Sequence, residues 1–236
     1  MKSSPNNHIL IPPEPVDFDP TTTPTGTYKA GKKRDDNLAR ILDAAEEIFV
    51  ARGFKGASIQ SIADAAGLPK ANIHYYYKNK TTLYQSVLSK LINLWNTQFN
   101  EIKAEDDPAT ALDGFIREKV RISFTHPNTS KLFAMEVISG APNLQVYMRT
   151  DLRRWVKDRA HVIQSWIEQD KMPATDPVQL IFLIWSSTQH YADFETQVLS
   201  IMNKSRYDAR TQKKAADFLS DTILRGCGLR PLSAKT

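Results

Sequence analysis

Apolar residues recur at helical spacing along most of the chain from about residue 37 onward. Positions three and four apart lie on one face of an α-helix, so each such run predicts a helix with one buried side. The first run ends at Gly53, and its apolar face comprises Leu38, Ile41, Leu42, Ala45, Ile48 and Phe49. No stretch shows the convincing alternation of apolar and polar residues that a half-buried strand would show. The pattern therefore predicts an all-α fold with roughly nine helices.

The rest of the chain carries longer runs of the same kind. We expect helices over 80–103, from 108 onward, over 132–138 after a break at 126–128, and over 152–170, 177–202 and 210–225. Asp176 and Pro177 are a typical helix start, since the carboxylate can accept backbone N–H groups and proline needs no N–H there. The last helix has an apolar stripe that must be covered, either by a second copy of the chain or by the protein's own core. This stripe consists of Ala215, Phe218, Leu219 and Ile223.

Residues 59–80 predict two short helices joined by a tight turn. Gly67 can adopt the left-handed conformation that ends a helix, and Leu68 can fill the gap between the two helices. Ala63 is small where the helices must cross, and Ser58 can cap the first of them. The apolar positions are Ile59, Ile62, Ala63 and Ala66 in the first helix and Ile73 and Tyr76 in the second. This joint pattern is typical of a helix-turn-helix, which places its second helix in the major groove of DNA.

The second of these helices, over about 69–76, presents side chains that we expect to contact DNA. Asn72 can pair with adenine through two hydrogen bonds, Ala71 can approach a thymine methyl group, and Lys70 can meet a phosphate or a guanine edge. His74 and Tyr75 lie on the outer face of the helix. Tyr76 is expected to pack inward with its hydroxyl near a phosphate.

Further contacts are expected from neighbouring segments. Lys80 would bind the phosphate backbone, and Ser58 would present its hydroxyl and a helix N-terminus to a phosphate. A flexible basic arm at 29–34 can reach a minor groove, although it can equally be a solubilising leader. Tyr77 and Lys78 have plainer interpretations, as a core side chain and a solvated lysine. The expected DNA contacts are Lys32, Lys33, Arg34, Ser58, Lys70, Ala71, Asn72, His74, Tyr75, Tyr76 and Lys80.

Charge and composition divide the chain into four parts. The net charge is +5, and residues 29–80 hold ten Lys and Arg against six Asp and Glu, as suits a surface that meets phosphates. Residues 1–28 contain six of the thirteen prolines and few apolar residues, which predicts a disordered tail. We therefore expect a tail at 1–28, a DNA-binding domain at 29–82, a ligand-binding and dimerisation domain at 83–228, and a C-terminal tail at 229–236.

Several protein classes are disfavoured by what the sequence lacks. Cys227 is the only cysteine, so there is no intrachain disulfide and no cysteine-based zinc pattern. No run approaches the ~18 apolar residues of a membrane span, and the N-terminus lacks the features of a signal peptide. No combination of nucleophile, base and orienting group stands out, so an enzyme is the weakest interpretation. We expect a cytoplasmic protein without metal, cofactor or membrane partner.

One predicted helix carries side chains suited to a flat polar ligand. Trp185, Thr188 and Gln189 lie at i, i+3 and i+4 and so share one helix face. The indole can stack on a ring, while the amide offers one acceptor and two donors. These groups match the alternating C=O and N–H groups of uracil or thymine. A tryptophan on a helix face is more often a core residue, so that plainer interpretation stays open.

Two side chains of an earlier predicted helix can complete such a pocket. Phe133 could close it. Glu136 could accept a hydrogen bond from a ring N–H, provided that Arg117 or Arg121 balanced its charge, because an unpaired buried carboxylate is strongly unfavourable.

The helix-turn-helix region resembles the N-terminal domain of the TetR family of bacterial transcriptional regulators. The most family-specific piece is the run Tyr-Tyr-Lys-Asn-Lys at 76–80 followed by Leu83-Tyr84. Pro69 is a departure, since many members have a Ser or Thr there that caps the helix and contacts a phosphate. The runs 132–142 and 180–198 resemble the pyrimidine-utilisation members of this family, with Trp95 and Gln189 at matching positions. The resemblance covers about residues 36–228.

The resemblance implies a homodimer that binds a palindromic operator. It further implies a three-helix DNA-binding domain and a helical ligand domain whose last two helices form a four-helix bundle across the interface. We expect a regulator, most simply a repressor, that leaves its operator when uracil or thymine shifts the helix at 80–103. A repressor for a lipophilic drug or fatty acyl ligand, and a ligand-independent architectural DNA binder, are the alternatives. The expected effector site is Trp95, Phe133, Glu136, Trp185, Thr188 and Gln189.

Overall fold

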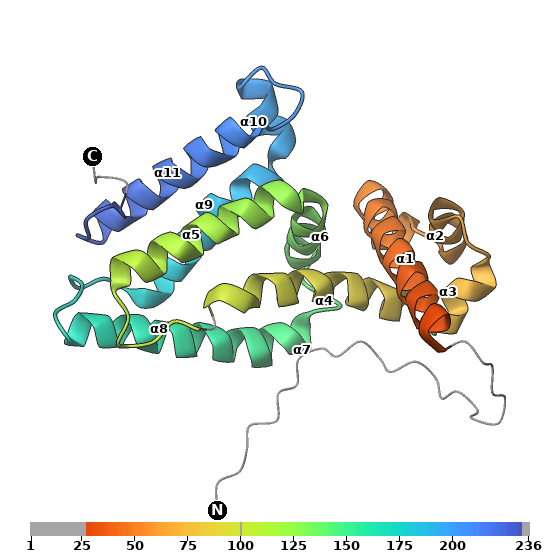
Figure 1. Cartoon of the computed structure of the whole chain (residues 1–236), viewed down its shortest axis with the longest axis horizontal. Helices are drawn as coiled ribbons and strands as arrows, with labels where there is room; N and C mark the ends of the chain where they lie inside the picture. Colours follow the sequence, from red (N-terminus) through yellow and green to blue (C-terminus); the bar gives the residue numbers. More distant parts are fainter. Residues whose placement is uncertain (1–26, 100, 233–236) are drawn as a thin grey trace, which may run out of the picture.

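The computed structural model describes the backbone of residues 27–99 and 101–232, and within these ranges the side chains except those of 27–33, 91 and 93–99. The regular structure of these residues is entirely helical, which confirms the predicted fold class (Figure 1). Of the tails predicted at 1–28 and 229–236, residues 1–26 and 233–236 lie outside the described residues, while the backbone of Thr27 and Tyr28 belongs to the first helix. No helix in the described ranges is long and apolar enough to cross a membrane.

Eleven α-helices and one short π-helix, η1, follow one another along the described chain. A first group, which we call the head, contains α1 (Thr27–Gly56), α2 (Ile59–Ala66) and α3 (Lys70–Tyr76). Figure 1 shows α4 (Lys80–Phe99) extending from the head towards the remaining helices, which we call the body. The body comprises α5 (Pro108–Thr125), α6 (Pro127–Ile138), α7 (Gln145–Tyr147), η1 (Met148–Leu152), α8 (Arg153–Glu168), α9 (Pro177–Asp193), α10 (Glu195–Ile201) and α11 (Ala209–Gly226).

The head is built on the apolar face predicted for its first helix. All six predicted positions of that face lie in one core cluster, and α1 leaves helical geometry at Gly53 (φ 65°, ψ 172°), where the sequence predicts its end. The same cluster continues into α4, so the first half of α4 belongs structurally to the head. Its buried side chains include Ile41, Ala45, Phe49, Ile62, Ala63, Ile73, Leu83, Val87 and Leu88.

The body has a second core between α5, α8, α9 and α11. Trp166 is fully buried there, and its indole N–H donates to the carbonyl oxygen of Lys103 (3.0 Å). The apolar stripe of the last helix is covered mainly from within the chain, since Ala215, Leu219 and Ile223 are buried in this core. Phe218 is 65% exposed and is the member of the stripe left uncovered.

Several boundaries differ from the sequence-based expectations. The basic arm at 29–34 is expected to be flexible, but its backbone continues α1. The expected break at 126–128 is confirmed at His126, between α5 and α6, but α6 begins at Pro127 and not at Leu132, because proline fits the first turn of a helix, where no N–H is needed. The predicted helix 177–202 is interrupted at Phe194, and the predicted end of α4 at Lys103 lies beyond Phe99. The short α7 and η1 were not predicted.

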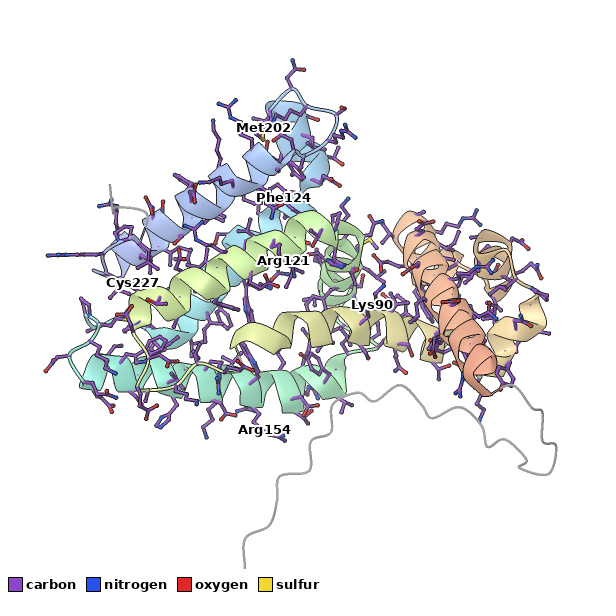
Figure 2. The ribbon with its side chains drawn as sticks, viewed as in Figure 1. Lys90, Arg121, Phe124, Arg154, Met202 and Cys227 are labelled. Carbon is purple, nitrogen blue, oxygen red and sulfur yellow. The ribbon has the colours of Figure 1, made fainter. Side chains whose placement is uncertain are left out.

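One polar contact fastens α4 to α1, and two more connect α6 of the body with α1 and with α4. Lys90 on α4, labelled in Figure 2, pairs with Asp43 on α1 (2.8 Å) and fastens α4 to the head. The Thr129 hydroxyl at the start of α6 donates to Glu46 on α1 (2.8 Å). The Tyr84 hydroxyl on α4 donates to the Glu136 carboxylate on α6 (3.0 Å). Helix α6 is therefore hydrogen-bonded to both α1 and α4.

Candidate functional site

The turn between α2 and α3 is fixed from both sides. Gly67 takes the left-handed conformation (φ 62°), its N–H donates to the carbonyl of Asp64 (3.1 Å), and the N–H of Leu68 donates to that of Ala63 (3.0 Å). These bonds satisfy carbonyls that the end of a helix leaves free. Arg40 on α1 adds a bond from its guanidinium to the carbonyl of Ala66 (2.7 Å). The predicted role of Gly67 is confirmed.

The start of α2 is capped as predicted. The Ser58 hydroxyl accepts the N–H of Ser61 (3.0 Å), and the Ser61 hydroxyl accepts the N–H of Ser58 (3.1 Å). This reciprocal arrangement is a capping box. Ser58 remains exposed, so the cap does not hide it from an approaching phosphate.

Helix α3 has one face in the core and one in solvent. Ile73 is fully buried, and Tyr77 directly after the helix is 4% exposed, in agreement with its predicted core role. Tyr76 is partly buried, and its hydroxyl donates to the carbonyl of Arg34 (3.5 Å). The outer face carries Lys70, Ala71, His74 and Tyr75, all exposed, with Asn72 partly exposed beside them.

Lys80 is placed differently from what we expected. Its ammonium donates to the carbonyls of Phe54 (2.7 Å) and Ala57 (2.9 Å) and lies over the Phe54 ring, 4.5 Å from the centroid. An ammonium held by two carbonyls and a ring is not free to pin a DNA backbone. The expectation of a phosphate contact is therefore corrected to a clamp between α4 and the α1–α2 connection. In the basic arm, Arg34 is exposed, whereas the side chains of Lys32 and Lys33 lie outside the described ones.

The body contains a cavity of about 190 Å³ beside α6 and α9. Trp155 and Trp185 form part of its wall with their rings stacked, 5.8 Å between centroids and 28° between planes. The unpredicted π-helix contributes to the wall as well, as such irregular turns often do at functional sites. The described lining residues are Phe115, Lys119, Phe133, Val137, Tyr147, Met148, Leu152, Trp155, Trp185 and Gln189.

Three of the six residues expected at an effector site line this cavity, namely Phe133, Trp185 and Gln189. Thr188 does not, because it is fully buried and its hydroxyl donates to the carbonyl of Ile184 within α9 (2.6 Å). Helical spacing predicts that Thr188 and Trp185 share one face of the helix. A side chain three positions further along is nevertheless rotated relative to Trp185, and for Thr188 this rotation is enough to face the core. The side chain of Trp95 lies outside the described ones.

Glu136 is buried, but among different partners from those expected. Its carboxylate accepts from the Tyr84 hydroxyl and from the backbone N–H of Asn143 (2.6 Å). The arginines proposed as its partners are engaged elsewhere: Arg117 pairs with Asp113 (2.8 Å) and Asp217 (2.7 Å), and Arg121 pairs with Glu118 (2.6 Å). Glu136 thus braces the turn after α6 against α4, and the expectation that it faces a ligand is corrected.

Seven of the ten described lining residues were not expected, and Lys119 on α5 is the charged one among them. It is 3% exposed, and its ammonium donates to the Gln189 side-chain oxygen across the cavity wall (3.4 Å). Burial lowers its pKa to about 7, against the opposing effect of the Asp193 carboxylate. Its position was the available signal, because residue 119 lies four and three positions after Phe115 and Ile116 and so falls on the buried face of α5.

The chain is similar to known regulators over almost all of its described length. Residues 41–87 match the model of the family described as bacterial regulatory proteins, tetR family, and residues 88–230 match that of the YcdC-like protein, C-terminal region. The HTH-type transcriptional regulator RutR of Escherichia coli strain K12 is 34% identical over 191 residues, which cover 81% of this chain and 89% of that protein.

Solved structures support the same fold at lower identity. AibR in complex with isovaleryl coenzyme A and operator DNA is 17% identical, with a TM-score of 0.60 over 79% of this chain and 97% of that one. A bacterial regulatory protein in the tetR family from Rhodococcus RHA1 is also 17% identical, with a TM-score of 0.64 over 82% and 97%.

Proposed function

The chain belongs to the TetR family of bacterial transcriptional regulators, and we propose that it represses pyrimidine catabolism genes until uracil or thymine releases it from its operator. The observation that carries this proposal is the amide of Gln189 in an otherwise mainly aromatic cavity, beside the stacked Trp155 and Trp185. Flat rings stack on such walls, and an amide can match a ring edge that offers both C=O and N–H groups. The identity with RutR supports the same choice.

The size of the cavity favours a small effector. An engineered cavity of about 150 Å³ in another protein accommodates benzene. The cavity here has a volume of about 190 Å³, which leaves room for one such ring with a few small substituents. Uracil and thymine are single six-membered rings with two exocyclic carbonyl oxygens, so both match this volume.

The operator-binding half of the proposal rests on the exposed face of α3. Lys70, Asn72 and His74 are free to approach a major groove, while Ile73 holds the helix in the head. We propose that two copies of the chain present their α3 helices roughly 34 Å apart, one turn of DNA, to a palindromic operator. The AibR structure contains operator DNA, so a protein of this fold has been seen with a DNA partner.

The release step needs a path from the cavity to the head. Helix α6 provides one, because Phe133 and Val137 line the cavity while Glu136 on the same helix bonds Tyr84 of α4. A ligand that moved α6 would therefore move α4, whose first half is part of the head core. The ligand can change operator affinity only as far as it binds the two arrangements unequally.

A second effector class, a fatty acyl compound, is favoured by one observation. Most of the described cavity wall is apolar, and AibR, which shares the fold, was solved with isovaleryl coenzyme A. An acyl chain offers no hydrogen-bonding group to the Gln189 amide, whose oxygen would keep only its long contact with Lys119 (3.4 Å).

Tryptophan fluorescence and operator binding together test the proposal. We would titrate the purified protein with uracil, thymine and an acyl coenzyme A, and then measure affinity for the DNA upstream of its own gene with and without each compound. We expect uracil or thymine to quench Trp155 and Trp185 and to lower operator affinity, and Gln189→Leu to abolish both effects. Gln164→Leu on α8, outside the described cavity wall, is the matched control. A response to acyl coenzyme A alone would establish the second effector class instead.

A further inference from the structure

Two side chains stand apart from the rest of the cavity wall. Eight of the ten described lining residues are aromatic or aliphatic, counting the thioether of Met148 as apolar. The other two, Lys119 on α5 and Gln189 on α9, face each other across neighbouring helices. A mainly apolar pocket uses its few polar groups to fix the orientation and identity of its ligand. The chemistry of this pair therefore sets which ligand fits.

The geometry of the pair is that of a donor beside an acceptor. The Lys119 nitrogen and the Gln189 oxygen are 3.4 Å apart, beyond the roughly 2.7–3.2 Å of a well-formed N–H···O bond. Little bonding energy is lost if a ligand separates them. The N–H and C=O groups of a cyclic amide lie on adjacent ring atoms and point in nearly the same direction, so one edge of such a ring offers a donor to Gln189 and an acceptor to Lys119 together.

We propose that Lys119 and Gln189 form a donor–acceptor pair that recognises the N–H/C=O edge of a cyclic amide. This inference deepens the proposed function, since uracil and thymine are cyclic amides, but the edge alone defines the ligand class. Lys119 is then the specificity-determining residue, because it donates to the carbonyl oxygen of the ring. An acyl chain has no edge of this kind and would offer neither polar group a new hydrogen-bond partner.

The charges around Lys119 favour a hydrogen bond from its ammonium to a ligand oxygen. Burial disfavours the charged form of Lys119, whose pKa falls to about 7. The carboxylate facing it is Asp193 on α9, which accepts from the Ser130 hydroxyl of α6 (2.7 Å). Lys131 on α6 and His190 on α9 act on Asp193 in turn. A ring carbonyl would add an acceptor to the protonated amine in a region of low dielectric, where such a bond is strong.

The unmodified protein gives the first test. By calorimetry, we would measure the affinity for 2-pyridone and for N-methyl-2-pyridone, which keeps the carbonyl oxygen but has no N–H. We expect N-methylation to weaken binding at least about 10-fold, because the Gln189 oxygen loses its donor. Uracil stays uncharged between pH 6 and 8.5, so its affinity should fall as the pH rises above 7 and Lys119 loses its proton. Equal affinity for the two pyridones, or no change in uracil affinity with pH, would overturn the inference.

Substitution gives the second test. Lys119→Met keeps the length of the side chain and removes the donor, and we expect it to weaken uracil and 2-pyridone binding about 10- to 100-fold and to abolish the pH dependence. Lys157→Met on α8, an exposed lysine outside the described cavity wall, is the matched control. Operator binding without effector confirms that each variant is folded. Unchanged affinity in Lys119→Met would show that the lysine does not recognise the ring.

The outcomes separate this inference from the proposed function. If uracil binds and Lys119→Met binds it equally well, the pyrimidine effector stands and the recognition by Lys119 falls. If neither uracil nor thymine binds, but 2-pyridone binds and depends on Lys119, the cyclic-amide site stands and the pyrimidine assignment falls. If none of these compounds binds, both are overturned.

Discussion

The head and the body each place a lysine at the candidate contact with a partner, but in opposite surroundings. Lys70 on α3 is exposed to solvent, whereas Lys119 on α5 is 3% exposed at a cavity wall. The first ammonium lies in solvent, where it can neutralise a phosphate and release counterions without selecting a particular ring. Burial brings the pKa of the second to about 7, so its protonation depends on what lies beside it. We therefore propose that the same side chain supplies general affinity in the head and selectivity in the body.

The largest expected effect separates the two faces of α3. Ile73 is fully buried, so Ile73→Ala should lower the free energy of unfolding by about 2–5 kcal/mol and weaken operator binding through loss of the helix. Lys70→Ala on the exposed face should change the free energy of unfolding by less than about 0.5 kcal/mol while still weakening DNA binding. Urea denaturation followed by circular dichroism measures both. A loss of stability in Lys70→Ala as large as in Ile73→Ala would show that the exposed face is also structural.

Lys80 tests whether every lysine of the head acts on DNA. Its ammonium is held by two carbonyls, so Lys80→Met should lower the free energy of unfolding by about 1.5–3 kcal/mol. The slope of log affinity against log salt should stay unchanged. Lys70→Met, the matched change at an exposed position, should leave stability unchanged and lower that slope by about 0.9 if it contacts one phosphate. The reverse assignment of the two slopes would restore Lys80 as the phosphate contact.

The buried lysine makes stability depend on pH in a direction that exposed lysines do not. Lys119 has a pKa of about 7 in the folded protein, whereas an unfolded chain holds this proton up to about pH 10.4. Above pH 7 the unfolded state therefore binds more protons, so the free energy of unfolding should rise with pH, by at most about 1.4 kcal/mol per pH unit. Urea denaturation between pH 7 and 9 measures this rise. Lys119→Met should lack it, while Lys157→Met should retain it.

The contrast between the regions also explains what the sequence could predict. In the head, the side chains expected to contact DNA lie outside and the apolar side chains lie inside. Periodicity therefore places Ile73 in the core and Lys70 in solvent, and Gly67 marks the turn. In the body, polar groups are buried among apolar ones. Periodicity could not say whether Gln189 and Thr188 would face a cavity or the core, because that depends on which helix packs against which.

Two of the residues that the sequence-based reasoning placed wrongly, Lys80 and Glu136, share one physical cause. Lys80 and Glu136 are charged, and a charged side chain in a sequence is readily assigned to an external partner. In the structure each is bonded within the protein: Lys80 to the carbonyls of Phe54 and Ala57, 26 and 23 residues earlier, and Glu136 to Tyr84, 52 residues earlier, and to Asn143 in the turn after α6. Such contacts depend on tertiary packing and leave no local pattern. Lys119 was not predicted at the cavity wall for the opposite reason, because a lysine among apolar residues is usually assigned to solvent.

The smallest expected effect concerns the contact through which the two regions would communicate. The Tyr84 hydroxyl on α4 donates to Glu136 on α6, and Tyr84→Phe removes that single bond with almost no change in volume. We expect the free energy of unfolding to fall by about 0.5–1.5 kcal/mol. We also expect the effector to lower operator affinity by a smaller factor, because the coupling between the sites is itself a free energy of about 1–3 kcal/mol.

Tyr207→Phe is the matched control for this change. Its hydroxyl donates to the carbonyl of Tyr191 (2.8 Å), so the substitution also deletes one bond, but both residues lie within the body. Both variants should therefore lose similar stability, while only Tyr84→Phe should change the ratio of operator affinities with and without uracil. Equal ratios in the wild type and in Tyr84→Phe would mean that the signal does not need the bond between Tyr84 and Glu136. The hydrogen bond from Thr129 of α6 to Glu46 of α1 would then be the polar link from α6 to the head that remains among the described residues, since it does not involve α4.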